Sequence, residues 1–316
     1  MSAPAAGAPA GRPRVSVVMP AHNAERTIVA AIESVVAQTF GDWEIVLCDD
    51  ASTDGTRAAA EACFARHGVT RGRVLALAHC GPAEARNHGI RAARGEFVAF
   101  LDDDDTWEPA KLARCVEAIQ AGGLDVVCHS EVWLDAGSGD RSVHHYSGLF
   151  DARVHPLVSL MRNNPFSTSA LMARRAHLLA AGLFDPSLPS AEDYDLWIRL
   201  AMIPGIRIGF LDEALGTYLL RPGSESSKID RRVRALLAIG ERYAAPAAAA
   251  SRLGALEPWM FRAKTYFTSG IRYAQQGSRA RGAAMAAKGL LMWPFRFDFV
   301  LFAVRQRLAR REALGS

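Results

Sequence analysis

Short apolar runs alternate with longer amphipathic segments through the first 130 residues of the chain. The apolar runs predict strands at 15–19, 43–48, 74–78, 96–101 and 124–129. The segments between them predict helices at 25–38, about 54–66, 82–93 and 109–121. Strands that alternate with helices of about 10–15 residues are typical of a parallel sheet with helices on both faces. The pattern therefore predicts an α/β fold.

The alternation weakens after residue 130. Turn-forming residues at 135–140 predict a hairpin, and from about 228 the sequence becomes helical and rich in Ala and Arg. We predict three parts: a disordered Ala/Pro/Gly-rich segment at 1–13 that is not a signal peptide, a domain at 14–227, and a basic helical C-terminal region at 228–316. The domain should hold a Rossmann-like mixed, mostly parallel sheet flanked by helices.

Charge separates the same regions. The net charge is +4, but residues 1–230 contain 21 Lys+Arg and 29 Asp+Glu, whereas residues 231–316 contain 16 and 4. A basic region with interleaved aromatic residues indicates a surface that meets anions such as phospholipid or nucleic acid. No nucleic-acid recognition motif accompanies it, so we expect no nucleic-acid partner. Helical spacing at 297–308 suggests an interfacial membrane helix; packing of this stripe on the domain is the alternative.

No apolar stretch reaches the length of a membrane span, so we expect a cytoplasmic protein, with peripheral contact at the inner face of the cytoplasmic membrane as an open hypothesis. The five cysteines are widely spaced and include no C-x-x-C pair. This pattern favours reduced thiols over a disulfide or zinc-finger framework.

Four consecutive aspartates, Asp102–Asp105, follow one of the apolar runs. Adjacent carboxylates repel each other, and a hard divalent cation such as Mg²⁺ or Mn²⁺ removes that penalty by taking oxygen ligands. Ligands of open α/β sheets bind at the carboxyl ends of strands, which is where this cluster is predicted to lie. The alternative is an acidic loop on the surface.

Two further polar sets end other predicted elements. The segments 20–25 and 48–56 follow the first two strands, where a carboxylate can accept hydrogen bonds from a base or ribose. No glycine-rich phosphate loop is present, so a metal would have to hold the phosphates; Asp54 itself reads better as a helix cap. Glu192 and Asp193 begin a predicted helix, either as a cap or as a base kept ionised by the helix dipole.

The order of these motifs resembles a known family. The segments are VSVVMPAHNAERTI (15–28), WEIVLCDDASTDGT (43–56), GPAEARNHGIRAARGEFVAFLDDDDTWEPAKL (81–112) and AEDYDLWIRL (191–200). Over roughly residues 14–225 the chain resembles the family-2 inverting glycosyltransferases of the GT-A fold. The resemblance implies a nucleotide-diphospho-sugar donor, with a UDP-sugar as the first candidate, Mg²⁺ or Mn²⁺ as the cofactor, and inversion at the anomeric carbon.

The resemblance also implies roles for individual residues. The base and ribose pocket matches Pro20, His22, Asp49 and Asp50, although many relatives carry an aromatic residue where His22 stands. The metal motif matches Asp102 and Asp104, with Asp104 the first choice for metal contact and Asp103 beside them on the donor. Asp193 matches the general base, and Glu192 lies in the acceptor site. Arg221 stands where relatives place a cation near the diphosphate, and a surface arginine is the alternative. Arg86-Asn87 matches a recurrent segment that serves either substrate contact or the scaffold.

The predicted activity is metal-dependent transfer to an acceptor hydroxyl, on a saccharide or lipid-linked acceptor, in cell-envelope polysaccharide or glycolipid assembly. Two alternatives remain: an inactive sugar-nucleotide-binding protein, and a nucleotidyltransferase. The second normally needs a glycine- and lysine-containing phosphate loop near the amino terminus, and this sequence has none.

Overall fold

The computed structural model describes residues 11–221 and 228–293. By their internal contacts the residues form two compact units, which we describe separately. Unit 1 comprises Met1–Leu149, Pro165–Ser187 and Glu192–Arg221. Unit 2 comprises Phe150–Asn164, Leu188–Ala191 and Pro222–Ser316, so it differs from the predicted boundary by taking in segments from within the range 14–227. The apolar stripe at 297–308 lies outside the described residues.

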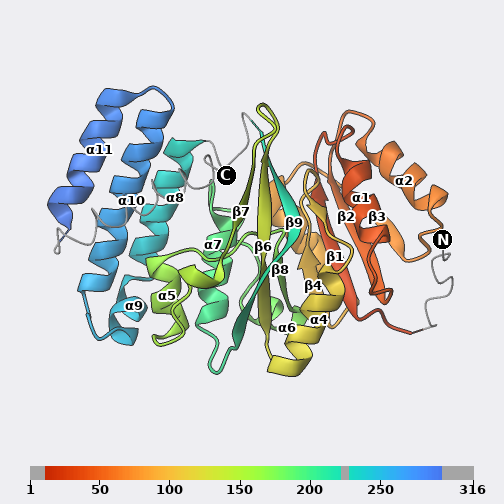
Figure 1. Cartoon of the computed structure of the whole chain (residues 1–316), viewed down its shortest axis with the longest axis horizontal. Helices are drawn as coiled ribbons and strands as arrows, with labels where there is room; N and C mark the ends of the chain where they lie inside the picture. Colours follow the sequence, from red (N-terminus) through yellow and green to blue (C-terminus); the bar gives the residue numbers. More distant parts are fainter. Residues whose placement is uncertain (1–10, 222–227, 294–316) are drawn as a thin grey trace. The chain divides into compact units, whose positions relative to one another are not determined.

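Unit 1 is built on one mixed sheet (Figure 1). Its strands are β1 (Val15–Ala21), β2 (Trp43–Asp50), β3 (Gly72–Leu77), β4 (Phe97–Phe100), β5 (Thr106–Trp107), β6 (Val126–Asp135), β7 (Arg141–His144), β8 (Leu171–Arg174) and β9 (Ile208–Leu220). The order is β3-β2-β1-β4-β8-β6-β9-β5, with β7 on β6. Its helices are α1 (Ile28–Val36), α2 (Thr56–Arg66), α3 (Gly81–Ala92), α4 (Lys111–Gly122), α6 (Arg175–Ala180) and α7 (Glu192–Ala201), with a short 3-10 helix at Ser147–Leu149.

The predicted α/β class and mostly parallel sheet are confirmed. The first four strands run parallel to one another, so β1, β2, β3 and β4 all end at the same edge. The loosened pattern after residue 130 has a physical cause, because β8 inserts antiparallel between β4 and β6 and the long β9 then runs parallel to β6. The predicted hairpin turn is also present: Asp135 accepts hydrogen bonds from the N–H groups of Gly137 and Ser138.

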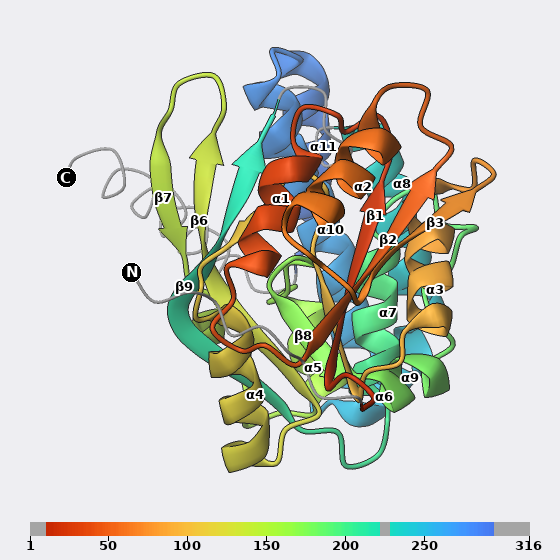
Figure 2. The same ribbon diagram turned by 90° about the vertical axis from the view of Figure 1, so that its right-hand side faces the viewer.

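Helices cover both faces of the parallel half of the sheet (Figure 2). Alternate residues of β1 and β2 pack with α1, α2 and α4 in the main core. The opposite face carries α3, which approaches β1 so closely that a Cβ added at Gly89 would lie 2.4 Å from Val18 Cγ1. This arrangement fixes the amino end of α3 next to the edge where the parallel strands end.

Unit 2 is helical, as predicted for the residues after 228. Its helices are α5 (Pro156–Arg162), α8 (Ile229–Arg242), α9 (Ala244–Ala250), α10 (Leu256–Gln275) and α11 (Arg279–Met292). Buried Glu257 accepts hydrogen bonds from Arg162 and from Ser251, and the amine of half-buried Lys264 donates to Asn163 Oδ1 at 2.7 Å. These contacts join the inserted segment 150–164 to α10.

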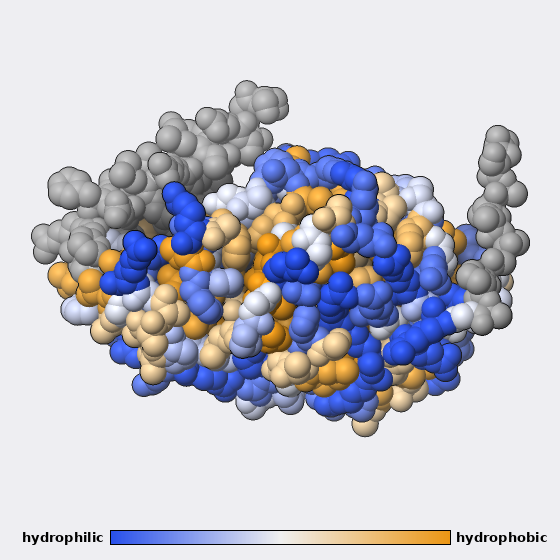
Figure 3. All heavy atoms as spheres, turned by 90° about the horizontal axis from the view of Figure 1, so that it is seen from below, coloured by the Kyte–Doolittle hydropathy of each residue, from blue (hydrophilic) through white to orange (hydrophobic). Residues whose placement is uncertain are grey.

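No helix among residues 11–221 and 228–293 is long and apolar enough to cross a membrane. Hydrophilic and apolar residues are interspersed over the face drawn in Figure 3.

Lys111 is a buried cation in the core of unit 1. Its side chain is 0% exposed, its Nζ has no hydrogen-bond partner, and the amine lies 3.5 Å from the ring centre of Trp107. Burial lowers the pKa of Lys111 from 10.5 to about 8. The unfolded chain therefore binds more protons than the folded one between pH 8 and pH 10.5, and stability should rise with pH through that window.

We predict that Lys111→Met, which keeps the length of the side chain without its charge, raises the free energy of unfolding at pH 7 by about 2 kcal/mol. The gain should shrink as the pH rises from 8 towards 10.5, because the parent protein then loses its buried charge. Urea unfolding at pH 7 and pH 10 measures both values, and an equal gain at the two pH values would contradict the explanation.

Candidate active site

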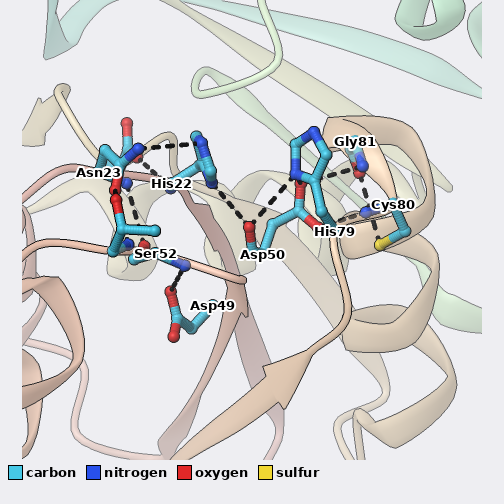
Figure 4. Close-up of polar contacts among 10 residues, drawn as sticks. His22, Asn23, Asp49, Asp50, Ser52, His79, Cys80 and Gly81 are labelled. Atoms are coloured by element: carbon cyan, nitrogen blue, oxygen red, sulfur yellow. Dashed lines mark hydrogen bonds and ion pairs between the residues drawn. The ribbon is translucent and has the colours of Figure 1, made fainter.

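The loops that follow β1 and β2 are tied to each other by side-chain hydrogen bonds (Figure 4). Asn23 Oδ1 accepts from the N–H of Thr53 at 2.8 Å, and the N–H of Asn23 donates to Ser52 Oγ at 3.0 Å. Asp54 accepts from the N–H of Thr56 at 3.0 Å, but it stands one residue before Gly55, which occupies the N-cap position predicted for Asp54. The two loops therefore form one rigid rim at the carboxyl edge of the sheet.

Asp50 ends β2 and holds the start of α3. Its carboxylate accepts from the N–H groups of Cys80 at 2.6 Å and Gly81 at 2.9 Å, and it pairs with His79 Nδ1 at 3.0 Å. Burial by itself would raise the pKa of Asp50, but the hydrogen bonds from Cys80 and Gly81 outweigh it and the pKa is lowered. Asp50 is therefore a fixed anion at the edge of the sheet.

The other residues expected around a donor base lie close by. His22 Nδ1 is 2.7 Å from the carbonyl oxygen of Asp50, and the ring centres of His22 and His79 are 5.0 Å apart. Asp49 is buried, and its carboxylate accepts from the N–H of Ser52 at 3.2 Å. Pro20 is buried within β1, next to Cys48 of β2.

The four aspartates after β4 point to four different partners. Asp102 pairs with Arg86 at 2.7 Å, and Asp103 accepts from the N–H of His22 at 3.1 Å. Asp104 pairs with Arg221. Asp105 is 1% exposed and accepts from Ser169 Oγ at 2.5 Å and from the N–H of Leu219 at 3.0 Å. Asp105 therefore anchors the loop, whereas the other three face the edge of the sheet.

Electrostatic repulsion within this cluster is only partly compensated. Burial and the neighbouring Asp104 raise the pKa of Asp103 to about 7. Burial also raises the pKa of Asp104, although the guanidinium of Arg221 opposes the shift. Arg221 therefore acts as a counter-cation for Asp104, although its side chain is 42% exposed at the surface.

Arg86 joins the aspartate cluster to the start of α7. Its guanidinium is 8% exposed, donates to Asp102 at 2.7 Å through one nitrogen and reaches Glu192 at 3.3 Å through another. The neighbouring Asn87 instead serves the scaffold, since its amide accepts from the N–H of Phe184 and donates to the Phe184 carbonyl, both at 2.9 Å. Arg86 therefore contacts the candidate site, whereas Asn87 stabilises the scaffold.

Glu192 and Asp193 lie in the first turn of α7, as predicted. The helix is anchored by Trp197, which is 0% exposed and packs on Phe100 and Phe184. Burial and the adjacent Asp193 raise the pKa of Glu192, while Arg86 opposes this. Asp193 Oδ1 accepts from the N–H of Tyr194 at 2.7 Å, and Thr168 Oγ1 lies 3.5 Å from its other oxygen.

Backbone strain is concentrated near these groups. Among the described residues other than glycine, four have positive φ: Asn23, Ala51, Leu183 and Ala191. Asn23 and Ala51 lie in the loops after β1 and β2, and Ala191 immediately precedes α7. Such conformations cost free energy and persist where the surrounding structure fixes them, often at functional sites.

Sequence reasoning missed two features of the site. His79 and Cys80 follow β3, and the signal was available, because a third parallel strand must end at the same edge as the first two. Ser169 links Asp105 to the N–H of Asp102, and nothing in its local sequence marks this role.

The oxygen donors of the aspartate cluster suit a hard divalent cation. Asp102 and Asp104 each present a carboxylate, and burial together with the neighbouring Asp102 raises the pKa of Asp104, a penalty that such an ion would relieve. Two carboxylates leave most of the coordination shell for water and substrate oxygens, which is how Mg²⁺ is usually bound beside phosphates. These residues therefore fit Mg²⁺ or Mn²⁺.

Comparison with known proteins identifies relatives of this chain. The model of "Glycosyl transferase family 2" matches residues 16–180. The "Putative glycosyltransferase EpsE" of Bacillus subtilis is 33% identical over 68% of this chain and 76% of its own length. The "Succinoglycan biosynthesis protein ExoO" of Rhizobium meliloti is 35% identical over 73% and 69%. The "UDP-Glc:alpha-D-GlcNAc-diphosphoundecaprenol beta-1,3-glucosyltransferase WfgD" of Escherichia coli is 44% identical over 31% and 38%.

Solved structures share the fold. S. aureus TarS 1-349 in complex with UDP-GlcNAc superposes with a TM-score of 0.64 at 21% identity, covering 89% of this chain and 82% of that one. The mannosyltransferase PcManGT from Pyrobaculum calidifontis, in complex with GDP-Man and Mn²⁺, gives 0.60 at 21% identity, covering 99% and 91%.

We predict that Arg86→Met lowers the free energy of unfolding by about 1–3 kcal/mol, because it leaves the half-buried carboxylates of Asp102 and Glu192 without their cation. Arg86→Lys should recover only part of this loss, since one ammonium cannot serve both carboxylates as a planar guanidinium does. Urea unfolding measures both, with Arg91→Lys as the control on the exposed face of α3, where the arginine pairs with Glu84. Equal stability of Arg86→Lys and the parent would contradict the bridging role.

Proposed function

The chain belongs to glycosyl transferase family 2, and from this premise we propose that it transfers a sugar from a nucleotide-diphospho-sugar to an acceptor hydroxyl with inversion at the anomeric carbon. A UDP-sugar is the first donor to test, because a structural neighbour was solved with UDP-GlcNAc and a relative is named for UDP-Glc. The acceptor we propose is a saccharide or lipid-linked saccharide of cell-envelope polysaccharide assembly, in keeping with the names of ExoO and WfgD.

One observation carries this proposal. The guanidinium of Arg86 contacts both Asp102 of the aspartate cluster and Glu192 at the start of α7. Asp102 lies 16 positions after Arg86 in the sequence, and Glu192 lies 106 positions after it. The side chain of Arg86 therefore holds together two segments that are far apart along the chain. A donor held at the cluster would have its anomeric carbon close to Asp193, the neighbour of Glu192.

The donor would lie along the edge where the parallel strands end. His22, Asp49 and Asp50 line the rim proposed for the base and ribose, with buried Pro20 supporting it from β1. Asp103 accepts from the N–H of His22, so the base pocket and the diphosphate site share a hydrogen bond. Arg221 is in reach of Asp104 and can turn to the diphosphate when that carboxylate is otherwise engaged.

Asp102 and Asp104 would hold Mg²⁺ or Mn²⁺, which when bound supplies positive charge against the negative charge that develops on the departing diphosphate. The PcManGT structure holds Mn²⁺ together with its donor, which supports this choice of ion.

Asp193 is the residue we propose as general base. It accepts the proton of the acceptor hydroxyl while the hydroxyl oxygen forms a bond to the anomeric carbon. The bond from that carbon to the diphosphate oxygen breaks on the opposite face, and its electron pair leaves with the nucleoside diphosphate. Asp193 lies in the first turn of α7, where the helix dipole favours a negative charge. Glu192, held by Arg86, would orient the acceptor.

We predict that Asp193→Asn lowers kcat by about 10²–10⁴-fold and leaves the KM for the donor unchanged, because it removes a proton acceptor and no donor contact. Asp104→Asn should instead raise the concentration of Mg²⁺ or Mn²⁺ needed for donor binding. Asp140→Asn, in the exposed turn between β6 and β7, is the matched control.

The assay is a screen of UDP-, GDP- and dTDP-sugars for binding and slow hydrolysis with each metal ion and with chelator. A donor that binds only with metal, and is lost in Asp104→Asn, supports the proposal. Donor binding without turnover on any acceptor tested, and unaffected by Asp193→Asn, would favour the sugar-nucleotide-binding alternative. Binding of no nucleotide-sugar would contradict the proposed function.

Membrane association of the C-terminal region is a proposal of its own. Residues 231–316 carry 16 Lys+Arg against 4 Asp+Glu. Among the described residues of α10 and α11, Trp259 is 48% exposed and Leu291 is 80% exposed. Cations with exposed aromatic and aliphatic side chains are the composition of surfaces that bind anionic lipid headgroups. Such a surface would bring the enzyme to a lipid-linked acceptor.

We predict that the full chain sediments with vesicles containing anionic lipid, and that it does so less as salt rises, because the attraction is screened. Trp259→Ala and Leu291→Ala should weaken binding, whereas Val143→Ala, which truncates an exposed valine of β7, should not. Equal sedimentation with neutral vesicles would contradict the electrostatic part of this proposal.

A further inference from the structure

Two histidines and an aspartate converge at the edge of the sheet in a way that glycosyl transfer does not require. A ring nitrogen of His22, a ring nitrogen of His79 and a carboxylate oxygen of Asp50 all lie within 4.8 Å of one another. His79 Nδ1 is 3.0 Å from Asp50 Oδ2, and His22 Nδ1 is 2.7 Å from the carbonyl oxygen of Asp50. Figure 4 shows that both histidines contact Asp50.

The donor set differs in kind from that of the aspartate cluster. Two imidazole nitrogens with one carboxylate oxygen are ligands for Zn²⁺ and similar transition ions, with a fourth position left to water. Mg²⁺ prefers oxygen ligands alone, so the cluster at Asp102 and Asp104 would not compete for the same ion. The two sites can therefore be told apart by the metal that they bind.

The surroundings support a site that is held in place and open to solvent. The Asp50 carboxylate is fixed by the N–H groups of Cys80 and Gly81, as outer-shell hydrogen bonds fix the ligands of metal centres. The side chain of His79 is 67% exposed, and His22 is exposed as well, so an ion can reach both rings.

A second group among the described residues, Glu33, Cys63 and His67, is less suited. Burial raises the pKa of Cys63, and a thiol must lose its proton to become a ligand. This group therefore provides the internal control.

We propose that His22, Asp50 and His79 form a binding site for a transition metal ion of the Zn²⁺ class, and that an ion bound there excludes the nucleotide donor. The exclusion rests on the proposed function, because it assumes that His22 and Asp50 line the donor pocket. In that case the base and the ion need the same side chains, and the transferase is inhibited by zinc at concentrations that leave its Mg²⁺ or Mn²⁺ site untouched.

The metal site is tested first, without nucleotide. Untagged full-length protein in excess Mg²⁺ is titrated with Co²⁺, and the visible bands of bound Co²⁺ are followed and then displaced by Zn²⁺. We expect one bound ion without a near-ultraviolet thiolate band. His79→Ala should weaken its affinity by at least about 10-fold, and His67→Ala should leave it unchanged. Unaltered affinity in His79→Ala, or loss in His67→Ala, overturns the site.

The exclusion is tested next with the nucleotide-sugar that binds best in the donor screen. Its binding is measured in excess Mg²⁺ as Zn²⁺ is added, to the parent and to His79→Ala. Chelation of Zn²⁺ by the nucleotide is equal for both proteins, so only the difference between them counts. Zn²⁺ should inhibit the parent at a concentration at least about 10-fold lower. Equal inhibition overturns the exclusion. Failure of every nucleotide to bind overturns it together with the proposed function, while the Co²⁺ titration still decides the metal site.

Discussion

The buried guanidinium of Arg86 is the interaction on which the arrangement of the site depends. It is held on the face of α3 that packs against the sheet, 5.6 Å from the ring centre of Phe184, and it lies between the loop after β4 and the first turn of α7. Burial by itself would lower its pKa, but the carboxylates of Asp102, Glu192 and Asp193 raise it, so the cation is fixed. Because a buried ion without a partner is strongly unfavourable, α3, the aspartate loop and α7 are held in one relative position.

Four adjacent aspartates are tolerated because the chain gives each a different surrounding. Asp105 turns into the core, where Ser169 Oγ and the N–H of Leu219 donate hydrogen bonds to its carboxylate in place of water. Burial raises the pKa of Asp105 well above its usual range. Asp102 has Arg86, and Asp104 has Arg221. Asp103 is left with one backbone N–H and a raised pKa. The repulsion that remains is therefore confined to the positions that face the edge of the sheet, where a cation would bind.

The parts of this structure that could be predicted from sequence are those specified locally. The apolar runs of β1, β2 and β4 and the helices between them follow from periodicity, and the position of Asp102–Asp105 at a strand end follows from the boundary of a run. Contacts between distant residues could not be predicted in this way. Arg86 and Glu192 are 106 positions apart, and the local sequence around either residue does not indicate that they are in contact. The antiparallel insertion of β8 and the assignment of residues 150–164 to the helical unit likewise depend on tertiary packing, through contacts such as Arg162 with Glu257.

The geometry at Asp50 limits how the proposed donor site could recognise a base. An ionised carboxylate has about four acceptor positions, and the N–H groups of Cys80 and Gly81 together with His79 already use three of them. Little capacity remains for Asp50 to read a base by itself. The rings of His22 and His79, 5.0 Å apart and inclined at 41°, are in contact and leave no room for a third ring between them. In the proposed donor site a base would then lie against the outer face of a ring, and Asp50 would act chiefly by fixing His79 and the start of α3.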